Sequence, residues 1–90
     1  MKLLYCRSCR DCLRLQPTLR TCSCGRTRGQ DHDGRPAEVY GRYAEVLGVQ
    51  NISLMHALNS PDLEPTVFGI GPDVRAWAYP HNYEKVVRLP

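Results

Sequence analysis

Five cysteines lie in the first quarter of this 90-residue chain, and no cysteine follows them. Four of them form two close pairs: Cys6 and Cys9 in a C-x-x-C motif, and Cys22 and Cys24 in a C-x-C-G motif. Two such pairs across a short hairpin are the ligand set of a tetrahedral four-sulfur zinc site. Turns around the pairs can aim backbone N–H groups at the sulfurs, and Gly25 suits a turn that needs a positive φ. The spacing therefore predicts one zinc ion per chain, bound by these four thiolates.

A chain this short buries only part of its surface on folding, so a crosslink by metal or disulfide is expected. The odd number of cysteines disfavours disulfides, and the first ten residues do not read as a secretory signal peptide. No apolar stretch is long enough to cross a bilayer. We therefore expect reduced thiols, a cytoplasmic location and no membrane association.

The pattern of apolar residues predicts a small, zinc-stapled α+β fold. Residues 1–29 should form an N-terminal zinc ribbon, built as a β-hairpin. Residues 30–90 should form a small β-rich body with one helix near residues 52–59, packed as one unit with the ribbon. Alternating apolar residues predict strands at 3–5, at 13–15 and 19–20 with a break at Pro17, at 37–49 with a bend at Gly41, at 66–70, at 74–80 and at 84–90.

The segment NISLMHALNSP carries the helix signal. Ile52, Met55 and Leu58 recur at helical spacing, which predicts an apolar face. Asn51 or Ser53 is the expected N-terminal cap, because both side chains can accept a hydrogen bond from the first turn. The start of this helix could also hold an anion, so Asn51 and Ser53 are candidate ligand-binding residues.

Three single residues have a structural and a functional interpretation. We interpret His56 as a histidine on the helix surface rather than a ligand. Trp77, the only tryptophan, is expected to anchor the core, with a binding platform as the second choice. Cys12 is expected to be a small residue buried on a strand. Its alternatives are a substitute for Cys9, a fifth sulfur in a multi-metal cluster, or a redox thiol.

Asp31, His32 and Asp33 stand together in a loop rich in glycine and charge. They could bind a second metal ion. Three adjacent polar side chains rarely point at one centre, so we favour a solvated loop tip.

The charge is uneven along the chain. Residues 1–35 contain eight Lys or Arg and three Asp, a formal charge of +5, and residues 36–90 contain four Lys or Arg and six Asp or Glu, a formal charge of −2. A four-thiolate zinc centre carries −2 and leaves the basic segment at +3. No aromatic residues interleave these arginines in the chain, and stacking on bases would need them. We therefore expect weak, salt-sensitive, nonspecific binding to nucleic acid at most.

The order of these motifs resembles a group of small bacterial and phage-borne zinc-ribbon proteins. Their pattern is C-x-x-C-x-D, then R-x-C-x-C-G and a glycine, then Y-x-G and L-G-x-x-N-x-S. The matching residues are Cys6, Cys9, Asp11, Arg20, Cys22, Cys24, Gly25, Gly29, Tyr40, Leu47, Gly48, Asn51 and Ser53, and Gly41 follows Tyr40 directly. Here Cys12 stands where an apolar residue is usual, and Asp31 where an aromatic is expected. The resemblance implies a zinc-ribbon fold and a bacterial or phage-infected cell, and it implies no activity.

The sequence favours a non-catalytic adaptor that binds a partner, most simply a protein. It shows no nucleophile elbow and no phosphate-cradling glycine loop. Two alternatives stay open. One is a structural component of a larger assembly, such as a phage particle. The other is a binder of a small ligand or anion, or an enzyme, centred on Asn51, Ser53 and His56.

Overall fold

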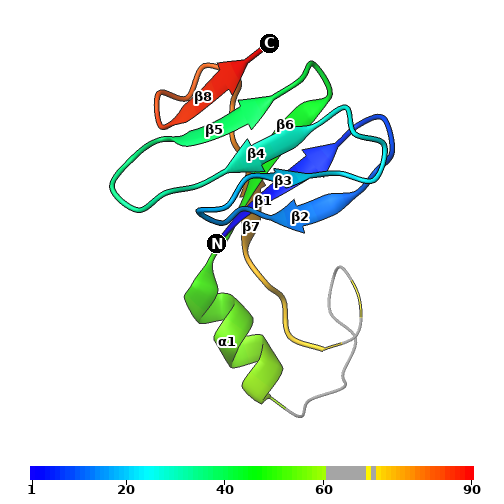
Figure 1. The fold of residues 1–90 in the computed structure, drawn as a ribbon. Helices are drawn as coiled ribbons and strands as arrows, with labels where there is room; N and C mark the ends of the chain where they lie inside the picture. Colours follow the sequence, from blue (N-terminus) through cyan, green and yellow to red (C-terminus); the bar gives the residue numbers. More distant parts are fainter. Residues whose placement is uncertain (61–68, 70) are drawn as a thin grey trace.

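A computed structural model describes residues 1–60, 69 and 71–90 of the chain. The predicted α+β class is confirmed: the described residues form eight strands and one short helix. The strands make two four-stranded sheets, and the helix stands apart from them (Figure 1). The strand expected at 66–70 falls on residues outside the described ones, except for Gly69.

The first sheet has the strand order β2-β1-β6-β7, and every neighbouring pair is antiparallel. Its strands are β1 (Lys2–Cys6), β2 (Cys12–Arg14), β6 (Ala44–Val49) and β7 (Ala76–Ala78). The second sheet has the order β3-β4-β5-β8. Its strands are β3 (Arg20–Thr21), β4 (Arg28–Gln30), β5 (Ala37–Tyr40) and β8 (Val86–Leu89). The last strand lies at an edge, as expected, and it runs parallel to β5.

The cysteine-rich segment forms two hairpins, one in each sheet. Strands β1 and β2 pair around the turn that contains Cys6 and Cys9, and β3 and β4 pair around the turn that contains Cys22 and Cys24. The chain passes from one sheet to the other in the stretch around Pro17, where a break between strands was expected. Both cysteine turns consequently end up at neighbouring hairpin tips.

Strands from both halves of the chain share each sheet. Along its whole length β1 pairs with β6, from Lys2 opposite Gly48 to Cys6 opposite Ala44. In the other sheet β4 pairs with β5. These two strands, β5 and β6, are the pair expected at residues 37–49, and the bend between them contains Gly41.

The hydrophobic core lies where the inner faces of the two sheets meet. Alternate residues of β1, β5 and β6 point into it, as the period of two in a strand requires. The sheets approach closely at Gly29, where an added Cβ would lie 2.8 Å from Leu15 Cδ2. The buried members of the core are Leu4, Leu15, Ala37, Val39, Ala44, Val46 and Val86.

The helix α1 (Asn51–Asn59) confirms the expected element, and the apolar residues expected on one face of it are exposed. None of its residues is buried, and Ile52, Met55 and Leu58 are 61%, 53% and 76% exposed. Figure 1 shows α1 extending away from both sheets. The cap prediction was wrong: Gln50 occupies the N-cap position without a side-chain cap bond. No helix among the described residues is long and apolar enough to span a membrane.

Two expectations of burial were wrong. Trp77 is 45% exposed on β7, an edge strand of the first sheet whose three residues are all exposed. Cys12 is exposed although it lies on a strand. It pairs with Tyr5, which alternates with the buried Leu4 and Cys6, so Cys12 projects from the outer face of the sheet.

Candidate metal centre

The two hairpin turns bring four sulfurs together. The Sγ atoms of Cys6, Cys9, Cys22 and Cys24 all lie within 4.8 Å of one another. Within this cluster the Sγ atoms of Cys6 and Cys24 are 3.8 Å apart, and those of Cys22 and Cys24 are 3.5 Å apart. Cys6 and Cys22 are buried, Cys9 is half-buried and Cys24 is exposed, so the cluster lies at the surface with its inner side closed.

Each turn closes through a backbone hydrogen bond back to its first cysteine. Arg10 N donates to Cys6 O at 2.7 Å, and Gly25 N donates to Cys22 O at 3.0 Å. The residue after the second cysteine has a positive φ in both turns: 63° for Arg10 and 78° for Gly25. The two turns therefore end in the same left-handed backbone conformation, although the first turn is one residue longer and only the second has the glycine that this conformation favours.

Side chains from each turn also bind the other turn. Asp11 Oδ2 accepts hydrogen bonds from Ser23 N at 3.0 Å and from Ser23 Oγ at 2.8 Å. Arg26 Nη1 donates to Ser8 Oγ at 3.1 Å. These contacts hold the two cysteine pairs in position independently of any ion. Sequence reasoning missed this role of Asp11, although its place two residues after Cys9 was part of the motif it recognised.

Hydrogen bonds stabilise the thiolate form of the inner sulfurs. Burial opposes ionisation of Cys6, but interactions with the Thr27 hydroxyl and with the backbone of Cys9 and Ser8 outweigh it and lower its pKa to about 6. The pKa of Cys22 is also lowered: burial again opposes ionisation, and hydrogen bonds from neighbouring groups exceed it. Deprotonated sulfur is the form that binds metal.

Cys24, the exposed member of the cluster, has a raised pKa instead. A backbone hydrogen bond from Arg26 favours the Cys24 thiolate, but desolvation and the neighbouring cluster sulfurs outweigh it and raise the pKa of Cys24 to about 11. Several negative sulfurs this close repel one another, so one of them keeps its proton when no cation is present. A bound cation would remove that repulsion and release the proton.

The other residues singled out in the sequence lie away from this cluster. Cys12 is not among the four gathered thiols, and all five cysteines are free. Asp31 forms an ion pair with Lys2, with 3.6 Å between Oδ2 and Nζ. Among the described residues the four cysteines are the one group with the spacing of a metal site, so the Asp31-His32-Asp33 loop does not form a second one.

The structure separates the candidate ligand residues at the start of α1. Asn51 Oδ1 accepts a hydrogen bond from the amino group of Met1 at 3.1 Å. Ser53 Oγ donates to Gln50 O at 3.1 Å and accepts from Arg75 N at 3.0 Å. Ser53 and His56 border one surface hollow, and Asn51 borders another. The two polar side chains thus hold the helix to the first sheet.

The cluster fits a tetrahedral ion. Metal–sulfur bonds of about 2.3 Å place the sulfurs of a tetrahedral site about 3.8 Å apart, close to the distances of 3.8 Å and 3.5 Å from Cys24 Sγ to the sulfurs of Cys6 and Cys22. The fold and the site together define a small α+β protein whose four clustered cysteines can bind a metal ion. Comparisons with protein-family models, with curated proteins and with solved structures gave no match.

Proposed function

We propose that this protein is a small non-catalytic adaptor, stapled by one structural zinc ion that Cys6, Cys9, Cys22 and Cys24 bind. The observation that carries the proposal is the tetrahedral spacing of four thiols at two hairpin tips. Four protein ligands fill the tetrahedral coordination of zinc, whereas catalytic zinc sites keep one position for water or substrate. The metal would therefore stabilise the fold rather than perform chemistry.

Zinc is the proposed metal because soft thiolate ligands in a tetrahedral set select zinc or iron–sulfur centres. The free cysteines support a reducing compartment, and we assign the protein to the cytoplasm. Elemental analysis of gently purified protein should find one zinc per chain and negligible iron. A zinc content near zero, two zinc ions per chain, or iron with thiolate-to-iron absorption would contradict the proposal.

The partner that we propose is a protein, and α1 supports this choice. Ile52, Met55 and Leu58 expose apolar side chains on a helix that none of the described residues buries. Amphipathic helices commonly bind partners through anchors at such spacings. Leu58→Ser should reduce crosslinking to a host-cell partner, identified by mass spectrometry, while Asn59→Ala on the same helix should not. An identical crosslinked set for both variants would contradict the role of the helix.

Nucleic acid is proposed only as a weak, nonspecific partner. The arginines near the cysteine turns already make intramolecular contacts: Arg7 pairs with Glu45 at 2.9 Å, and Arg28 lies 5.0 Å from the centre of the Tyr40 ring. Arg26 likewise lies over the ring of Tyr43. Binding phosphate would compete with these contacts. A polarisation titration should give micromolar or weaker affinity at physiological salt, about 10⁻⁶ M or above, and nanomolar binding would contradict the proposal.

A further inference from the structure

A basic pocket lies beside the loop that contains Asp31, His32 and Asp33. Its volume is about 340 Å³, and Lys2, Gly34, Arg35, Pro36 and Lys85 line it. This volume falls in the range of small-molecule sites, roughly 300–1,000 Å³. Gly34 leaves space at its edge, because an added Cβ would meet no atom within 4 Å. The described residues that line the pocket include three cations and no carboxylate.

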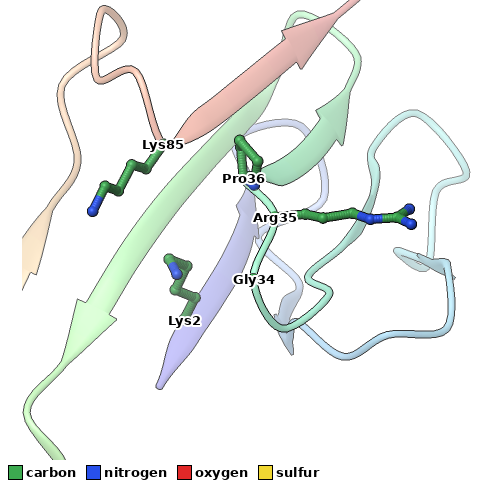
Figure 2. Close-up of a pocket in the computed structure, with 5 residues that line it drawn as sticks. All are labelled: Lys2, Gly34, Arg35, Pro36 and Lys85. Atoms are coloured by element: carbon green, nitrogen blue, oxygen red, sulfur yellow. The ribbon is translucent and has the colours of Figure 1, made fainter.

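Two of the three cations face the pocket together. Both lysines line the pocket, and Figure 2 shows Lys85, just before β8, and Lys2, on β1, on either side of β6. Arg35 points its guanidinium in the other direction. Lys2 also pairs with Asp31 at 3.6 Å, whereas the ammonium group of Lys85 forms no ion pair among the described residues. The pocket therefore presents two ammonium groups, one of them shared with a carboxylate, and it suits an anion.

An exposed aromatic ring lies two strands away from the pocket residue Lys2 in the strand register. Lys2 stands opposite Gly48, and Gly48 stands opposite Trp77, so all three lie in one row on the same face of the first sheet. The indole covers Gly48: an added Cβ there would lie 2.3 Å from Trp77 Cε2. One face of the ring thus lies on backbone, while 45% of the residue stays exposed.

Neighbouring aromatic side chains hold the indole in this position. Trp77 and Tyr79 contact edge to face with ring centres 6.0 Å apart, and Tyr79 stacks on Tyr83 at 5.1 Å. Both tyrosines pack against the hydrophobic core. Lys85 follows Tyr83, the last of these aromatic residues, by two positions in the chain. A fixed, solvent-facing ring beside two lysines is what a planar base attached to a phosphate requires.

We propose that this pocket binds the phosphate of a nucleotide through Lys2 and Lys85, while the nucleobase stacks on the exposed face of Trp77. The ligand is either a free nucleotide or the phosphorylated end of a single strand, because both carry the same chemistry. The site is separate from the metal centre and does not depend on the adaptor function. Phosphate alone should bind weakly, since two lysines attract it as point charges without a bidentate fork.

Isothermal titration of the metal-loaded full chain can test the site with three probes. These are adenosine 5′-monophosphate, inorganic phosphate and adenosine. The nucleotide should bind in a saturable way, and at least about tenfold more tightly than inorganic phosphate or adenosine, because stacking on an aromatic ring adds to phosphate binding. A short 5′-phosphorylated oligonucleotide and its unphosphorylated form distinguish the two sources. Preference for the phosphorylated strand over the mononucleotide would identify a strand end.

Three variants assign the residues. Lys85→Ala should weaken nucleotide binding about tenfold. Trp77→Ala should reduce the affinity for the nucleotide to the affinity for inorganic phosphate. Arg42→Ala is the matched control, because this exposed arginine is not among the residues that line the pocket, and it should keep wild-type affinity. Near-wild-type far-UV circular dichroism and zinc content check that each variant folds. The absence of saturable nucleotide binding, equal affinity for nucleotide and phosphate, or a loss for Arg42→Ala equal to that for Lys85→Ala would overturn the proposal.

Discussion

The carboxylate of Asp11 accepts two hydrogen bonds from Ser23, one from its backbone nitrogen and one from its hydroxyl, and so joins the two cysteine turns. The first of these residues follows Cys9 by two positions, and the second lies between Cys22 and Cys24. A shift in either turn would move the sulfurs that it carries. This contact therefore positions the cluster without touching the ion.

Replacing Asp11 tests this positioning role. Asp11→Ala should weaken metal retention about 10- to 100-fold, because groups that orient metal ligands commonly have effects of this size. Asp11→Asn should weaken it less, since its amide oxygen can still accept from Ser23. Competition with a chromophoric chelator measures the effect. Asp33→Ala is the control, because this exposed residue lies outside the cluster. Equal metal affinity for wild type and Asp11→Ala would show that the contact is incidental.

Four of the five cysteines should bind the metal, and Cys12 should not. Cys22→Ser should lose the metal and unfold at least the two cysteine hairpins, since structural zinc contributes about 10 kcal/mol or more to folding. Cys12→Ser should keep the metal and a stability close to wild type, because Cys12 is exposed and outside the cluster. Elemental analysis and thermal unfolding measure both. Metal loss in Cys12→Ser, with retention in Cys9→Ser, would mean that the ligand set is wrong.

Arg10 offers a site for stabilisation. Its φ of 63° is left-handed, which costs a residue with a side chain about 1–2 kcal/mol. Arg10→Gly removes this strain, and the greater freedom of glycine in the unfolded chain offsets part of the gain. We expect a net increase of about 0.5–1 kcal/mol in the free energy of unfolding, measured with denaturant. Arg14→Gly, on the regular strand β2, should instead destabilise the protein. A loss of stability in Arg10→Gly would show that its side chain matters more than its backbone.

The lowered pKa of Glu45 predicts how the stability of the protein depends on pH. Burial would raise its pKa, but hydrogen bonds and positive charge from Arg7 and His81 outweigh burial and lower it. Arg88 contacts the same carboxylate at 3.5 Å. Because the pKa is lower in the folded state, the stabilisation is complete above the unfolded-state pKa of about 4.3 and is lost as the pH falls through the folded-state value.

The comparison of wild type with Glu45→Gln isolates this effect. At about pH 6 the variant should be less stable by about 1–2 kcal/mol, and the difference should shrink as the pH falls below about 4.3. Acid also protonates the cluster thiolates, but it does so in both proteins, so the difference between them reports Glu45. Denaturant unfolding at a series of pH values gives the measurement. A difference that stays constant across this range would rule out the carboxylate charge as its source.

Features that depend on neighbouring residues in the chain could be predicted from the sequence. Cysteine pairs in tight turns, the strands of residues 37–49 and the helix all follow from local spacing, because periodicity and turn chemistry act over a few residues. The clustering of four thiols also followed, since two close pairs joined by a short connection have few other ways to meet. The prediction that Asn51 or Ser53 caps the helix was wrong, because Met1 and Arg75, from distant segments, bind these side chains.

Only the tertiary structure decided which surfaces are covered. The helix has an apolar face by its spacing, yet no described segment packs on it, so Ile52 and Leu58 remain exposed. Cys12 and Trp77 have the composition of core residues, but strand order and register place one on an outer face and the other at a border. Lys2 and Lys85 meet in one pocket although 82 residues lie between them. The pairing of distant strands brings such residues together, and no local pattern records that pairing.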